Sequence, residues 1–344
     1  MDTGYIKKTG EDVGMGENVN SRIGFKGVED LGSGQKATFQ LEKRFNVNDG
    51  TNNSSRNKDW EGAANVGLKG DNWGAVRLGR INGIATENIR KFDPFYQYGV
   101  GAMIDSTQRG VRQDNMIRFD SLDYYGFSFS ASYSLGGNMN KSSRDIDGYL
   151  VRDSGDPAGT SNGYDNDGYA LGLNYKNGGF AATANYQVLA DSNRSSLWNA
   201  GVSYSWDTVK LEALYQATHD KGGVEGRQSK AWPKDAEGNY TNYYNSLDEQ
   251  QALLGVEWKV GPGRLNASAQ WLSVEGNGNG GAYSDIDADA WKVAIGYTYN
   301  LSKRTSLYGI AAYTDWDDDK QAAKIFGDYS DKVTGLQFGI THKF

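Results

Sequence analysis

Residues 332–344, the last thirteen of the chain, alternate between apolar and polar side chains with a period of two. Leu336, Phe338 and Ile340 share one face of this pattern, and Gln337 lies on the other. Alternation with this period is typical of a β-strand whose two faces meet different surroundings. The strand ends on an aromatic residue, Phe344. This pattern suits the wall of a transmembrane β-barrel, which meets lipid outside and water inside, better than a soluble sandwich.

The same alternation recurs along the whole chain in about sixteen stretches of roughly 8–13 residues. Residues 250–260 and 290–301 are clear examples, each with a continuous apolar face. Tight turns, such as residues 177–179, alternate with long polar loops, such as residues 136–167. One end of the predicted barrel therefore carries the turns and the other end carries the long loops, as in outer-membrane barrels.

Residues 81–113 form a segment of about thirty residues that lacks clean alternation, and such irregular segments inside a compact fold are usually functional or disordered. The segment contains Phe92, Phe95, Tyr96 and Tyr98. Because these aromatic groups need apolar surroundings, we predict that the segment folds inward instead of extending into water.

The composition agrees with a barrel and excludes several other classes. The chain has 344 residues, 38% of them hydrophobic, and no continuous apolar run of the length that a transmembrane helix needs. The absence of Cys excludes disulfides and thiolate metal sites. The net charge of -7 argues against a nucleic-acid partner. Met1 is followed by Asp2 and by no leader-like segment, so we expect any export signal to have been removed.

Several motifs, in order, carry a resemblance to a known family. They are NVNSRIGFKGVEDLGSGQKATFQLE at residues 18–42, GLKGDNWGAVRLGR at residues 67–80, DNMIRFDS at residues 114–121, LSKRTSLYGIAAY at residues 301–313 and the terminal HKF. Together they resemble the Gram-negative general porins of the neisserial and β-proteobacterial type, and the resemblance covers essentially the whole chain. Each motif alone is weak, and their order makes them specific.

The resemblance implies an all-β fold: a sixteen-stranded antiparallel transmembrane β-barrel with an inward-folded third loop. Residues 1–344 would form this single domain, with the constriction loop at about residues 81–113. The family also implies a longer first strand, so the chain is expected to start mid-strand. The terminal aromatic, Phe344, would be part of the signal for barrel assembly.

The implied function is a general diffusion porin of the outer membrane, a water-filled channel for ions and small hydrophilic solutes. The expected partners are two further copies in a homotrimer, outer-membrane lipid and lipopolysaccharide, and the solutes themselves. No cofactor and no metal are expected, because two histidines and no cysteines offer no ligand cluster.

The family's pore constriction places arginines of the barrel wall opposite acidic groups of the inward loop, and such rings of opposite charge sort ions. Arg22 and Arg112 match two of the family's arginines, whereas Gly62 stands at the position of a third. Arg80 and Arg118 also match family positions and are expected to line the lumen. The missing arginine, with the net charge, favours a weak cation preference.

On the loop, Glu87, Asp93 and Asp105 are the candidate acids of the constriction. Each of them could instead be merely solvated or paired, because Arg90 and Arg109 lie among them.

Alternative functions stay open from the sequence alone. The aromatic residues of the loop could form a slide in a substrate-specific porin for sugars or small acids. A plugged barrel or adhesin would have no conductance, and a soluble secreted β-protein would need no detergent. A hydrolase built on His219 is a weak alternative, because a triad needs a nucleophile beside its base. His342 is expected at the membrane interface or a subunit contact.

Overall fold

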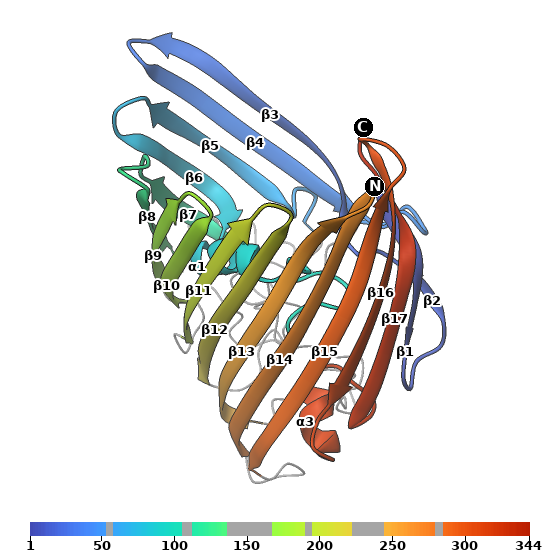
Figure 1. The fold of residues 1–344 in the computed structure, drawn as a ribbon. Helices are drawn as coiled ribbons and strands as arrows, with labels where there is room; N and C mark the ends of the chain where they lie inside the picture. Colours follow the sequence, from blue (N-terminus) through green and yellow to red (C-terminus); the bar gives the residue numbers. More distant parts are fainter. Residues whose placement is uncertain (53–57, 105–111, 136–166, 190–194, 222–243, 279–284) are drawn as a thin grey trace.

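The computed structural model describes residues 1–344 except 53–57, 105–111, 136–166, 190–194, 222–243 and 279–284 (Figure 1). The described chain contains one antiparallel sheet of seventeen strands. Sixteen of them are at least seven residues long, and the other, β2, has three residues. The predicted all-β fold, built on one antiparallel sheet, is therefore confirmed.

The first half of the wall consists of shorter strands. They are β1 (Asp2–Lys8), β2 (Gly14–Gly16), β3 (Ser21–Gly32), β4 (Gln35–Phe45), β5 (Ala63–Gly70), β6 (Gly74–Asn82), β7 (Arg112–Asp120), β8 (Phe127–Ser134) and β9 (Gly168–Asn177). The second half contains the longest strands. They are β10 (Phe180–Val188), β11 (Ser196–Trp206), β12 (Val209–Lys221), β13 (Tyr244–Val260), β14 (Gly263–Gly278), β15 (Ile286–Asn300), β16 (Thr305–Asp315) and β17 (Lys332–His342).

Each strand from β3 to β17 pairs with the next one along the chain, and β17 then pairs with β1, from Asp2 opposite Thr341 to Lys8 opposite Gly335. β2 pairs with the other edge of β1. β2 and β3 run in the same direction and follow each other closely, so together they occupy the place of one wall strand. The wall thus has the sixteen positions that the sequence predicts.

The ladder does not close between β3 and β1 within the described residues. β3 pairs with β4, and the contact across the gap is a pair of hydrogen bonds between Ser21 and Asp2. Figure 1 shows β3 and β4 extending past the rim of the wall at this side. The wall therefore has one seam without a strand ladder.

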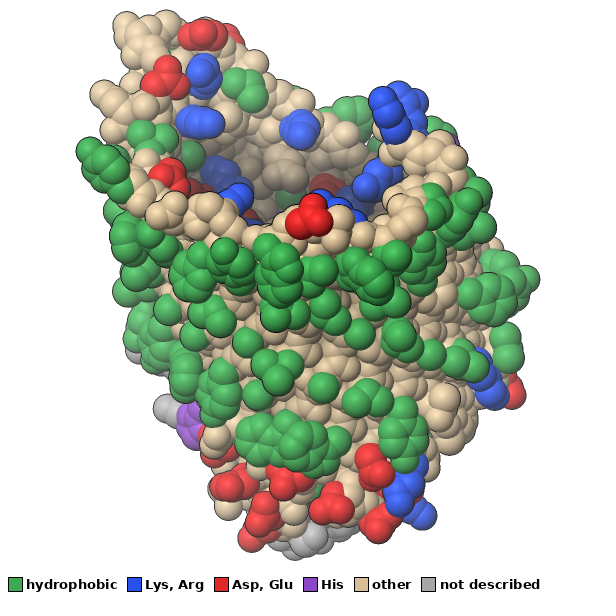
Figure 2. Space-filling model, viewed as in Figure 1, with side chains coloured by type: hydrophobic (Ala, Val, Ile, Leu, Met, Phe, Trp, Pro, Cys, Tyr) green, Lys and Arg blue, Asp and Glu red, His purple; other side chains and the backbone are tan. Residues whose placement is uncertain are grey.

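The two faces of the wall differ as the alternation predicts. Large apolar side chains such as Leu254, Val293 and Phe338 are exposed on the outside, whereas Asn185, Gln187 and other polar side chains are buried on the inside. Figure 2 shows the outer hydrophobic side chains gathered toward the two ends of the wall. The hollow at the short-turn end contains Lys and Arg together with Asp and Glu side chains (Figure 2).

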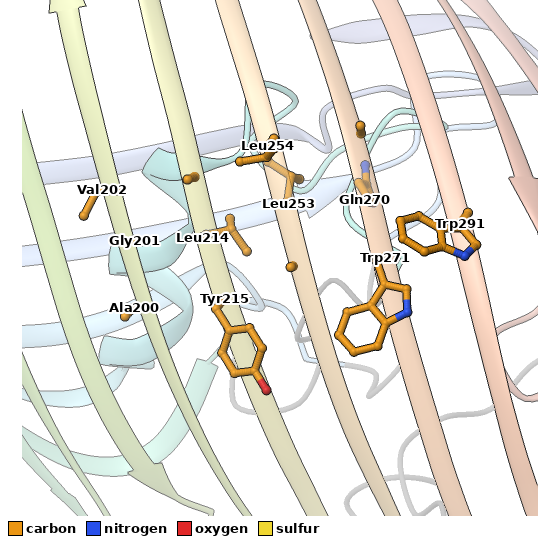
Figure 3. Close-up of a pocket in the computed structure, with 13 residues that line it drawn as sticks. Ala200, Gly201, Val202, Leu214, Tyr215, Leu253, Leu254, Gln270, Trp271 and Trp291 are labelled. Atoms are coloured by element: carbon orange, nitrogen blue, oxygen red, sulfur yellow. The ribbon is translucent and has the colours of Figure 1, made fainter.

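Figure 3 shows the outer face of β11 to β15, where Tyr215, Trp271 and Trp291 form a row. Small residues such as Ala252 lie between the aromatic side chains, which leaves a shallow apolar depression of about 600 Å³. The Trp271 indole N–H donates to Asp289 Oδ1 over 3.2 Å. This depression belongs to the outer surface of the barrel and not to its lumen.

Three short helices interrupt the described strands. α1 (Ile84–Ile89) and the 3-10 helix η1 (Arg90–Phe92) lie between β6 and β7, inside the barrel (Figure 1). α3 (Lys320–Ile325) caps the long-loop end between β16 and β17, where Trp316 is fully buried beside it. No helix of the described residues has the length and apolar character needed to cross a membrane.

Candidate functional site

The first half of the inward loop is held against the inner wall by α1. This helix contacts β9, β10 and β11. The Asn88 side-chain amide donates to Asn185 Oδ1 over 2.8 Å, and Asn185 in turn donates to Asn199 Oδ1 over 2.9 Å. Glycine makes the close approach feasible, because a Cβ at Gly172 would lie only 2.5 Å from Ile84. The loop is therefore docked on the wall.

The turn after η1 is organised by the carboxylate of Asp93. It accepts hydrogen bonds from the backbone N–H groups of Phe95 at 2.9 Å, Gln97 at 2.8 Å and Met103 at 3.4 Å. Tyr96 and Gln97 adopt positive φ angles of 54° and 62° in this turn. Asp93 is 0% exposed, and burial raises its pKa to about 6 although the three N–H groups oppose the shift. Its carboxylate shapes the loop and does not face the lumen.

The far end of the loop is tied to the opposite part of the wall. Val100 N–H donates to Gln337 Oε1 over 3.1 Å, and Ile104 N–H donates to Gln270 Oε1 over 3.0 Å. Lys292 Nζ donates to the Ala102 carbonyl over 2.6 Å. The loop therefore crosses the lumen and is anchored on both sides, which narrows the channel.

The apolar residues of the loop pack on the wall as the sequence predicts. Phe92, with Ile89 and Met103, contacts Leu214 and Leu253. Phe95 and Val100 form a second cluster with the inner faces of β15 and β16. Burying these side chains stabilises the docked loop.

Across from the loop, the wall strands β3, β4 and β7 carry a basic cluster. Arg22 and Arg44 share one carboxylate, Glu42, at 3.6 Å and 3.2 Å. Arg112 Nε donates to the Gly62 carbonyl over 2.8 Å. Arg112 forms no ion pair within the described residues, and Arg44 is one of its closest charged neighbours. Gly62 stands where the family has a third wall arginine, and Arg44 supplies a guanidinium to the same cluster.

Arg80 lies beside this cluster and is balanced by acids. Its guanidinium contacts Glu61 at 2.9 Å and Asp114 at 2.6 Å, and Lys58 also contacts Asp114 at 2.7 Å. Such mutually paired charges hold the strand ends together and add little net charge to the lumen.

Glu87 is the loop acid that faces the wall. Its carboxylate lies 3.0 Å from Arg118, which also contacts Asp120 at 2.7 Å. Arg77 contacts the same Asp120 at 2.7 Å. Glu87 therefore joins the loop to the wall through a buried arginine.

On the opposite wall, β12 to β14 carry a second charged cluster beside Tyr96. Arg264 contacts Glu257 at 2.7 Å, and Lys210 lies 3.3 Å from the same carboxylate. Lys210 also contacts Glu212. The Tyr96 hydroxyl donates to Glu257 over 3.3 Å. Charges of both signs are present here in equal number.

The structure thus brings Arg22, Arg80, Arg112 and Arg118 to the inner wall near the loop, and Glu87 contacts one of them. Asp105 lies outside the described residues. Phe344 follows β17 and is 86% exposed. Its role in assembly stays a prediction.

The sequence did not place Arg44 and Arg264 in the lumen, and it named Arg90 only as a neighbour of the loop acids. The inward direction of Arg44 could have been predicted, because Arg44 is two residues after Glu42 in β4 and alternate residues of a strand face the same side. The sequence assigned Arg264 to a turn, although it is the second residue of β14. The side-chain direction of Arg90 depends on how the loop folds.

No catalytic constellation appears in the described part of the chain. His219 contacts Asp248, and Ser196 lies opposite His219 in the ladder, but no Ser196–His219 hydrogen bond is formed there. Among the described residues no group of three or more His, Cys, Asp or Glu side chains could hold a metal ion.

A wall that is apolar outside and polar inside, with a charged lumen narrowed by its own loop, defines a pore-forming protein of a membrane. A family model described as Gram-negative porin matches residues 1–319. An outer membrane porin protein of Bordetella pertussis is 30% identical, over 96% of this chain and 83% of that protein. The major outer membrane protein P.IB of Neisseria meningitidis serogroup B is 28% identical, over 95% and 84%.

Solved structures share the fold. The anion-selective porin from Comamonas acidovorans has a TM-score of 0.72 at 24% identity, over 100% of this chain and 97% of that chain. OmpT of Vibrio cholerae, in a trimer form, has a TM-score of 0.62 at 12% identity, over 99% and 96%.

The chain belongs to the Gram-negative porin family, of the neisserial and β-proteobacterial type. It is an outer-membrane diffusion porin, and its family consists of channels and not of enzymes.

Proposed function

We propose that this porin prefers anions, and that its wall arginines set the preference. The observation that carries the proposal is the excess of unbalanced positive charge around the loop. Arg22 and Arg44 share the single carboxylate of Glu42. Arg90 and Arg112 form no ion pair within the part of the chain that the structure describes.

Among the described residues, the constriction acids that face the lumen are each in contact with a base, and buried Asp93 accepts only backbone N–H groups. Glu87 and Asp120 contact Arg118, and Glu257 contacts Arg264. A carboxylate that is paired with a guanidinium attracts mobile cations less than a free one, whereas an unpaired guanidinium attracts anions. This balance favours anions, in place of the weak cation preference suggested by the net charge of the whole chain. The anion selectivity of the Comamonas porin is consistent with the proposal.

The test is the zero-current potential of detergent-purified protein in a planar bilayer under a KCl gradient. The wild-type potential is expected to have the sign of chloride selectivity. Arg112→Gln removes one unpaired charge, so the chloride-to-potassium permeability ratio should fall by about twofold or more. Higher salt should weaken the preference, because ions screen the wall charges.

Arg304→Gln is the matched control, since Arg304 is exposed in the turn between β15 and β16 and undergoes the same loss of charge. This control should keep the wild-type ratio. A cation-selective wild-type channel, or an unchanged ratio in Arg112→Gln, would show that these arginines do not set selectivity.

The sugar-slide alternative has little support from the loop. Phe92 and Phe95 are only 5% and 6% exposed, and both pack against the wall. Without these rings, the aromatic surface left for a sugar comes from Tyr96 and Tyr98. We therefore favour a general channel with an electrostatic filter.

We also propose that three copies assemble into a homotrimer, with outer-membrane lipid and lipopolysaccharide around the remaining outer wall. The trimer form of the Vibrio cholerae neighbour supports the assembly. The exposed apolar side chains of the outer face support contact with lipid.

A further inference from the structure

A pocket of about 220 Å³ lies between the inward loop and the wall, at the level of the short turns. The loop contributes Arg90, Tyr96 and Tyr98, and β14 contributes Arg264 and Asn266. Arg264 is the second residue of β14, directly after the turn. The pocket is therefore near the hollow that Figure 2 shows at this end of the barrel.

Both guanidinium groups of the pocket lie against tyrosine rings. Arg90 Cζ is 5.3 Å from the centre of the Tyr98 ring, and Arg264 Cζ is 5.8 Å from the centre of the Tyr96 ring. An aromatic ring against the face of a guanidinium restricts its orientation and leaves the N–H groups at its edge free to donate. The two cations are thus held in place before any ligand arrives.

The two arginines differ in their charge balance. Arg264 is paired with Glu257 at 2.7 Å. Arg90 has no ion pair and no side-chain hydrogen bond within the described residues, and its buried Nε has no acceptor. Burial raises the pKa of Tyr98, but Arg90, Arg22 and Arg44 outweigh burial and lower it. The positive potential at this side of the pocket is therefore not cancelled.

The wall of the pocket also contains an acceptor without a donor. Asn266 is 8% exposed, and its Nδ2 donates to the Pro94 carbonyl over 2.7 Å. This bond fixes the orientation of the amide, and the buried Oδ1 is left without a partner. Buried polar atoms are normally satisfied, so an unpaired acceptor in the same pocket as an unpaired guanidinium calls for an external partner.

We propose that this pocket binds a small organic monoanion that also carries a hydroxyl or amino donor. The carboxylate of the solute accepts from Arg90, and its donor group satisfies Asn266 Oδ1. The proposal rests on the porin function above and names a solute class for the same channel. Binding must be weak enough for release, as conduction requires.

The experiment compares L-lactate with propionate, which has the same charge and lacks the hydroxyl. Each is added to the short-turn side of single channels in a KCl bilayer. Lactate should reduce the chloride current saturably, with half-saturation at about 1–10 mM. Propionate should bind about fivefold more weakly, because one hydrogen bond is lost.

Two variants locate the effect. Arg90→Gln should weaken the lactate block about tenfold or more, since it removes a charge-assisted contact. Arg304→Gln, the control with the same charge change, should leave the block unchanged. Heat-modifiable migration in gels should show that every variant is folded.

The subsite is overturned if the channels conduct normally but lactate and propionate act alike. It is also overturned if Arg90→Gln keeps the wild-type block, or if only Arg112→Gln removes it. Folded, inserted protein with no conductance would instead overturn the open channel and the subsite together.

Discussion

At the scale of single residues, Asp93 shows that one buried carboxylate can set the shape of a pore. Its two oxygens accept three backbone N–H groups from within ten residues of the loop. Hydrogen bonds to a charged acceptor contribute about 1.5–3 kcal/mol each. Burial of the charge offsets this contribution, as the raised pKa of Asp93 shows, and the side chain still supplies the acceptors for all three N–H groups of the turn.

Asp93→Asn should loosen the turn, because the amide has no charge and brings N–H groups toward backbone donors. Backbone amides of residues 93–103 should exchange with deuterium about tenfold faster or more than in the wild type. The measurement is hydrogen–deuterium exchange at pH 7.5, above the pKa of about 6, where Asp93 is ionised. Single-channel recordings should show more open-channel noise.

Asp123→Asn provides the control for this exchange. Asp123 makes one exposed hydrogen bond to the Gly126 N–H, at 2.8 Å, in a tight turn far from the loop. Asp123→Asn should leave the deuterium exchange of residues 93–103 unchanged. Wild-type exchange in Asp93→Asn would mean that the apolar packing of Phe95 and Val100 alone fixes the turn.

At the scale of strands, the outer wall should reject charge where the inner wall accepts it. Leu254 (Figure 3) is 66% exposed on the outer face of β13, one outward-facing position from Ala252 toward the short turns. Leu254→Arg should destabilise the barrel by about 2–4 kcal/mol, the cost of a basic side chain in the apolar band near the bilayer midplane. Urea unfolding in lipid vesicles, followed by tryptophan fluorescence, measures the change.

Gln40→Arg places the same charge on the inner face of β4, where water is present. It should change the free energy of unfolding by no more than about 0.5 kcal/mol. Equal destabilisation by Leu254→Arg and Gln40→Arg would contradict the assignment of the two faces.

Strands could be predicted from the sequence because alternation is a local property of each segment. The parity of Leu336 and Phe338 already fixes the outer face of β17, and both are exposed there. The loop could not be predicted in the same detail, because the hydrogen bonds of Asp93 depend on a turn in which Tyr96 and Gln97 adopt positive φ. The role of Arg90 likewise depends on tertiary docking.

At the scale of the whole molecule, each chain carries its own inward loop, whose described residues are anchored within the same chain. The loop is anchored to its own wall by Asn185, Gln270 and Gln337, on strands from both sides of the barrel. No contact from a second copy is needed to hold it. A homotrimer should therefore contain three independent pores and not one shared pore.

Two measurements test this arrangement. Light scattering of the detergent-purified protein should give about three times the mass of one 37.7 kDa chain, and heating should release monomers. Bilayer recordings should show closures in three equal steps, each with the same zero-current potential, because every pore has its own arginines. A single unitary step per trimer, or a monomer under mild detergent, would refute three independent pores. Equal steps with unequal selectivity would mean that neighbouring chains influence the charge balance of each lumen.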